Sequence, residues 1–96
     1  MTERAVFFLS DQTGVTAETL GHSLLTQFNG QHFRQVTLPF IDSEDKAKEA
    51  VARINEVGES MHLRPIVFST LVQDDFRDIV REANGFHMDI FDAFLE

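Results

Sequence analysis

The chain reads Ala5-Val6-Phe7-Phe8-Leu9-Ser10-Asp11-Gln12-Thr13-Gly14-Val15-Thr16-Ala17-Glu18 near its start, and this stretch decides the fold. Its first five residues are all apolar, which is typical of a strand buried on both faces of a parallel sheet. A small, hydroxylated loop containing Gly14 follows, and a helical pattern begins after it. A strand that leads through such a loop into a helix predicts the first unit of an α/β sheet.

The rest of the chain repeats this alternation. Period-two and continuous apolar patterns predict strands over residues 4–9, 33–40 and 65–70, with a short extended piece at 86–88. Helical spacing predicts helices over residues 16–28 and 74–83, and a long helix between them that Asp42 or Ser43 caps and that reaches Met61. The predicted fold is α/β and Rossmann-like, in βαβαβα order, with a three- or four-stranded parallel sheet and helices on both faces.

Three local features add detail. Gly21 lies on the apolar stripe of the first helix and is expected to let it approach the sheet closely. Pro39 lacks an N–H, which predicts a strand end or an edge strand. After Asp89 a last helical stretch carries Phe91, Phe94 and Leu95, which predicts an exposed apolar patch.

Composition narrows the class of protein. The 96 residues form one small α/β domain, residues 1–96, and the apolar pattern at its end predicts the N-terminal part of a longer chain. The formal net charge is −8, and the eight Lys and Arg residues are scattered, which argues against a nucleic-acid partner. The chain has no cysteine, no apolar run of membrane-spanning length and no signal-peptide pattern. We therefore expect a cytoplasmic protein without a membrane segment.

The loop after the first strand is the leading candidate for a site, with Asp11, Thr13, Gly14 and Thr16 as its ligand-binding residues. Ligands of α/β sheets bind beyond the carboxyl ends of the strands, and a helix start attracts an anion. A plainer reading assigns the same residues to local structure: Thr13 or Thr16 as the N-cap, Gly14 to a tight turn and Asp11 to an Asx-turn. Both readings stay open at this stage.

Motifs that would identify a complete active site are absent from these 96 residues. The sequence contains no G-x-x-x-x-G-K-[ST], G-x-G-x-x-G, H-E-x-x-H or G-x-S-x-G, and its four histidines lie far apart. We therefore assign no catalytic residue and no metal ligand. Ser69 and Thr70 end the third predicted strand and are expected at the same sheet edge as Asp11.

One resemblance is to the phosphate loop of flavodoxins, a flavin-binding family. Gln12-Thr13-Gly14-Val15-Thr16 is similar to its x-T-G-x-T segment. Asp11 stands where that family has a hydroxyl, and its carboxylate would repel a phosphate. The chain also lacks Trp and Tyr to flank a flavin ring.

A second resemblance covers essentially the whole chain. The motifs Ser10–Glu18, Gln27-Phe28, Val36-Thr37-Leu38-Pro39-Phe40 and Arg64-Pro65-Ile66-Val67-Phe68 resemble, with matching spacing, the start of the phosphoenolpyruvate synthase regulatory proteins. These are bifunctional serine/threonine kinases and pyrophosphorylases. The resemblance implies phosphorylation of a threonine with ADP as donor, removal of that phosphate with inorganic phosphate, and a target that is phosphoenolpyruvate synthase or the related pyruvate, phosphate dikinase.

The same resemblance places the family's P-loop in a C-terminal half that these residues do not include. The segment alone is therefore expected to be inactive, with ADP and phosphate as ligands of the parent enzyme. Partner recognition, effector binding and homodimerisation are the open roles for this part. The alternative from another class is a non-catalytic interaction or dimerisation module.

Overall fold

The computed structural model describes residues 3–27 and 32–89. Four strands form one sheet in the order β2-β1-β3-β4, and each neighbouring pair is parallel. The elements in chain order are β1 (Glu3–Leu9), α1 (Val15–Leu25), β2 (His32–Leu38), α2 (Glu44–Met61), β3 (Ile66–Ser69), α3 (Asp74–Val80) and β4 (Phe86–Asp89). The predicted α/β fold is confirmed, and the extended piece at 86–88 is its fourth strand.

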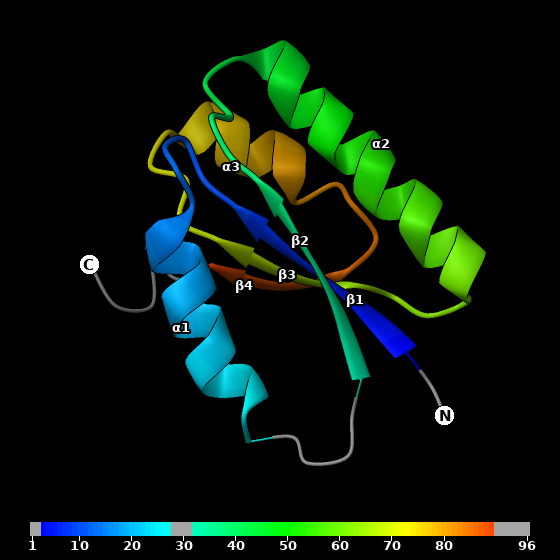
Figure 1. The fold of residues 1–96 in the computed structure, drawn as a ribbon. Coiled ribbons are helices and arrows are strands. Elements are labelled where there is room, and N and C mark those ends of the chain that lie inside the picture. The colour runs from blue at the N-terminus through cyan, green and yellow to red at the C-terminus, as the bar shows by residue number, and fades with distance from the viewer. Residues whose placement is uncertain (1–2, 28–31, 90–96) are drawn as a thin grey trace.

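Helices cover both faces of the sheet, with α1 on one face and α2 and α3 on the other (Figure 1). Successive side chains of a strand point to opposite faces, so β1 contributes to two cores. Ala5, Phe7 and Leu9 pack in the core with α2 and α3, while Val6 and Phe8 pack in the core with α1. The continuous apolar run of β1 follows from this double burial.

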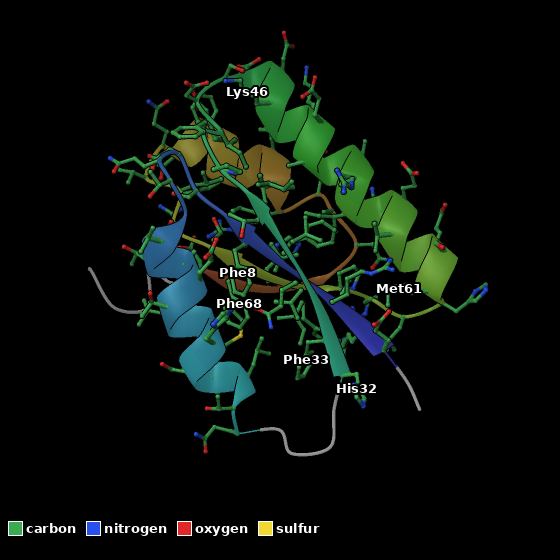
Figure 2. The ribbon with its side chains drawn as sticks, viewed as in Figure 1. Phe8, His32, Phe33, Lys46, Met61 and Phe68 are labelled. Atoms are coloured by element: carbon green, nitrogen blue, oxygen red, sulfur yellow. The ribbon has the colours of Figure 1, made fainter. Side chains whose placement is uncertain are left out.

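Gly21 brings α1 close to the sheet, as predicted. A Cβ at this position would lie 2.2 Å from Cε1 of Phe8. The Phe8 ring in turn stacks on Phe68 of β3, with ring centroids 5.7 Å apart. Figure 2 shows Phe8 and Phe68 together beside α1.

Within the described residues, the element boundaries agree with the predicted ones to within three residues. Helix α1 begins at Val15, α3 ends at Val80 and β2 ends at Leu38. Pro39 directly follows β2, the first strand in the order of the described sheet, so the prediction of a strand end is confirmed. Ser43 is the N-cap of α2, and its Oγ accepts a hydrogen bond from the N–H of Lys46 at 3.2 Å. Figure 2 labels Lys46 at this end of the helix.

Asp89 is the last described residue and ends β4. Arg77 of α3 is only 9% exposed and donates from Nε to Asp89 Oδ2 at 2.9 Å, which ties α3 to the carboxyl end of β4. The expected helix after Asp89, with Phe91, Phe94 and Leu95, lies outside the described residues.

Candidate functional site at the carboxyl edge of the sheet

The site candidates lie where the chain reverses its direction across the sheet. From β1 the chain moves to the edge strand β2, then returns past β1 to β3 on its other side. The loops after β1 and β3 thus leave in opposite directions, which is where open α/β sheets bind ligands. In Figure 1 the loops after β1, β2 and β3 gather at the upper left.

Backbone hydrogen bonds join the loop after β1 to the loop after β2. The N–H of Phe40 donates to Gln12 O at 2.8 Å, and the N–H of Ile41 donates to Ser10 O at 2.9 Å. Ser10 is 5% exposed, and its Oγ accepts from the N–H of Gln12 at 3.0 Å. The turn that the sequence assigned to Asp11 is therefore made by the Ser10 hydroxyl.

Gly14 is the N-cap of α1, and no side chain caps this helix end. Its φ of 90° lies in the left-handed region, where glycine is favoured over other residues. A Cβ at Gly14 would also lie 2.8 Å from Thr37 Cγ2. The reading of Thr13 or Thr16 as the N-cap is wrong, because the N-cap of α1 is Gly14 and no side chain donates or accepts a capping hydrogen bond there.

The candidate side chains of Asp11, Thr13 and Thr16 have no internal role. Thr13 and Thr16 are exposed and Asp11 is half-buried. Within the described part of the chain, none of the three side chains makes a hydrogen bond or an ion pair. Their hydroxyls and carboxylate are available to a ligand at the carboxyl edge.

Ser69 and Thr70 lie at this edge as expected, but their hydroxyls bond to backbone. Ser69 Oγ accepts from the N–H of Leu71 at 3.3 Å. The N–H of Thr70 donates to Leu9 O at 3.0 Å, which holds the loop after β3 against the end of β1. These two residues bond within the edge, while Thr13 and Thr16 are exposed and Asp11 is half-buried on the loop after β1.

Two pockets of the described residues are lined by residues other than Asp11, Thr13, Gly14 and Thr16. One of about 400 Å³ is at the opposite edge of the sheet, between Asn55, His62, Arg64 and Asn84. The other, of about 360 Å³, lies between the start of the loop after β2, with Pro39 and Ile41, and Lys46 and Arg53 of α2. The candidate site is thus an open surface formed by loops. Across residues 3–27 and 32–89, no three His, Asp or Glu side chains gather as a metal site requires.

Sequence reasoning missed three residues of this site. Ser10 and Phe40 join the loops, and Thr37 determines the space beside Gly14. No local pattern could reveal them, because each acts on a segment about 20 to 30 residues away in the chain.

The helices of the described residues include none that is long and apolar enough to cross a membrane.

The family model and the similar proteins point to the same family. The model of the kinase/pyrophosphorylase family matches residues 6–96. A relative from Janthinobacterium sp. (strain Marseille) is 56% identical over 93 residues, which are 97% of this chain and 33% of the relative. Relatives from Herminiimonas arsenicoxydans and Alcanivorax borkumensis are 53% and 52% identical over the same length.

All three relatives carry the name "Putative phosphoenolpyruvate synthase regulatory protein". The chain spans about a third of the length of each of them. The family model includes the loop from Ser10 to Thr16 and all of the described sheet except the first three residues of β1.

Proposed function

The chain belongs to the kinase/pyrophosphorylase family, and we propose that the protein carrying it regulates phosphoenolpyruvate synthase by reversible phosphorylation. In the forward direction a threonine hydroxyl of the target takes the β-phosphoryl group of ADP, loses its proton and leaves AMP. In the reverse direction inorganic phosphate takes the phosphoryl group from the threonine and leaves as pyrophosphate. The observation that carries the proposal is the family match over residues 6–96, together with the shared name of the relatives.

Donor binding belongs, in this proposal, to residues outside the segment. Phosphoryl transfer by a P-loop needs a backbone cradle and a lysine for the phosphates, and these 96 residues contain no such motif. The segment supplies instead a face for the substrate or for a small ligand. We expect the whole protein to act in the cytoplasm.

We assign this face to Asp11, Thr13, Gly14 and Thr16. The side chains of Asp11, Thr13 and Thr16 are free of partners among the described residues, and Gly14 is the N-cap of a helix whose first N–H groups favour an anion. No Lys or Arg lies between Ser10 and Thr16, so a bare phosphate would meet only the Asp11 carboxylate. A hydroxyl of the ligand would donate a hydrogen bond to the Asp11 carboxylate, and a cation that accompanies the ligand would pair with its charge.

The test uses the full-length protein, purified phosphoenolpyruvate synthase and ADP. We expect one phosphothreonine on the target by mass spectrometry, and release of pyrophosphate when phosphate replaces ADP. The 96-residue chain alone is the matched control and is expected to transfer nothing. A full-length protein that binds the target without transferring phosphate in either direction would favour the interaction module instead.

A further inference from the structure

Phe40 holds a backbone conformation that bulky residues rarely adopt. Its φ is 59°, in the left-handed region, and the residue is 54% exposed. Burial of the ring in the core therefore does not compensate for the strain of this conformation. A phenylalanine that is both strained and exposed points to a function for its side chain.

Two hydrogen bonds hold Phe40 in place. Its own N–H donates to Gln12 O and the next N–H, of Ile41, donates to Ser10 O. Glycine would adopt the same φ without strain and could make both bonds. The backbone geometry thus explains the conformation at position 40 but not the aromatic ring that it carries.

Two further apolar side chains are exposed at the same edge of the sheet. Val15, which begins α1, is 63% exposed, and Val72, in the loop after β3, is 51% exposed. Together with Phe40 they follow the ends of three adjacent strands, and we call them the apolar edge. The other exposed large hydrophobic side chains of the described residues are Phe86 and Met88, both on β4.

The charges around the apolar edge indicate what it contacts. The loop residues 10–14, 39–43 and 70–73 contain no Lys or Arg. Asp42 is paired with Lys46 of α2, with Nζ 3.0 Å from Oδ1, whereas Asp11 has no cation partner among the described residues. Lys46 and Arg53 of α2 flank the loop after β2 on its α2 side, where they line a pocket with Pro39 and Ile41. Asp11 belongs to the loop after β1, and an apolar protein segment with a basic side chain would match both the apolar residues and this carboxylate.

We propose that the apolar edge, centred on Phe40, is the docking site for an apolar segment of the target enzyme that carries a basic side chain opposite Asp11. The proposal rests on the proposed function, in which that target is phosphoenolpyruvate synthase. Phe40 supplies the aromatic contact that dominates many protein interfaces, and Val15 and Val72 exclude water around it. The backbone strain at Phe40 is retained because the ring must project from this loop.

The first experiment compares Phe40→Gly with wild type in the full-length protein. The measurements are the dissociation constant for phosphoenolpyruvate synthase, the KM values for that enzyme and for ADP, and thermal unfolding. We expect target binding to weaken at least tenfold, with an unchanged KM for ADP and a melting temperature equal to or above that of wild type. His62→Gly is the matched control, because His62 also has a positive φ, of 55°, but lies at the end of α2.

Each other outcome overturns the docking site in a distinguishable way. Wild-type affinity for the target in Phe40→Gly means that the ring does not contact it. A raised KM for ADP alone places the ring in the nucleotide site, and a lowered melting temperature means that another part of the same protein covers it. A wild-type protein that neither binds nor phosphorylates phosphoenolpyruvate synthase contradicts the proposed function itself.

The second experiment tests the charge of the occupant with Val72→Lys and Val72→Glu. Both remove the same apolar side chain, and they differ in the sign of the added charge. A basic segment predicts that Val72→Lys weakens target binding several-fold more than Val72→Glu, and that the difference shrinks at high salt. Equal effects of the two substitutions would overturn the assignment of a basic side chain to the target.

Discussion

The Oγ1 of Thr37 donates a hydrogen bond to Oε2 of Glu18 at 2.5 Å, and this bond joins the edge strand β2 to the first turn of α1. The methyl group of the same threonine occupies the space beside Gly14, where a Cβ would lie 2.8 Å from it. One side chain of β2 therefore positions both the start of α1 and its N-cap. The geometry of the candidate site depends on this contact.

Thr37→Val should destabilise the domain by about 1–3 kcal/mol, because it leaves the half-buried Glu18 carboxylate without its donor. Valine keeps the size and branching of threonine, so packing changes little. Urea unfolding of the two proteins measures the difference in the free energy of unfolding. Thr37→Ser, which retains the hydroxyl, is the control and should lose clearly less.

Gly14→Ala should cost about 1–3 kcal/mol for the strain at a φ of 90°, plus the cost of the contact with the Thr37 methyl group. The two parts can be separated, since Thr37→Ser removes the methyl and keeps the hydroxyl. Gly14→Ala should therefore be less costly in the Thr37→Ser background than in wild type, as a double-mutant cycle of unfolding free energies would show. Strict additivity in that cycle would assign the whole effect to backbone strain.

The order of elements and the two-sided burial of β1 could be predicted from the sequence, because apolar periodicity reports which residues face a core. The run from Ala5 to Leu9 predicted its own burial correctly. The close packing beside the N-cap Gly14 could not be predicted in this way, since the methyl group that lies there belongs to Thr37, 23 positions further along the chain. The conformation of Phe40 likewise depends on the carbonyl groups of Ser10 and Gln12, about 30 residues earlier.

Gly21→Ala tests the close approach of α1 to the sheet. Alanine normally stabilises a helix interior relative to glycine, but here its Cβ would lie 2.2 Å from the Phe8 ring. We expect a net loss of about 1–3 kcal/mol from overpacking, measured by urea unfolding. Ser23→Ala, at an exposed position of the same helix, is the control and should be neutral or slightly stabilising. A stabilised Gly21→Ala would mean that α1 moves outward at little cost.

The last prediction concerns Asp11, Thr13 and Thr16, whose side chains bond to nothing in the described part of the chain. Because Gly14 and not a threonine is the N-cap, Thr13→Ala and Thr16→Ala should change the free energy of unfolding by less than about 0.5 kcal/mol. Asp11→Asn is nearly isosteric and should leave the melting temperature equally unchanged.

In the full-length protein, by contrast, each of these three substitutions should impair phosphate transfer, with Asp11→Asn the most severe because it removes the one charge of the loop. Both directions of transfer are measured beside thermal unfolding, and Ser23→Ala on the outer part of α1 is the control. A threonine variant that loses stability along with activity would mean that this threonine stabilises the start of α1 instead of contacting a ligand. Wild-type rates in all three variants, in both directions, would reduce the loop to the start of a helix.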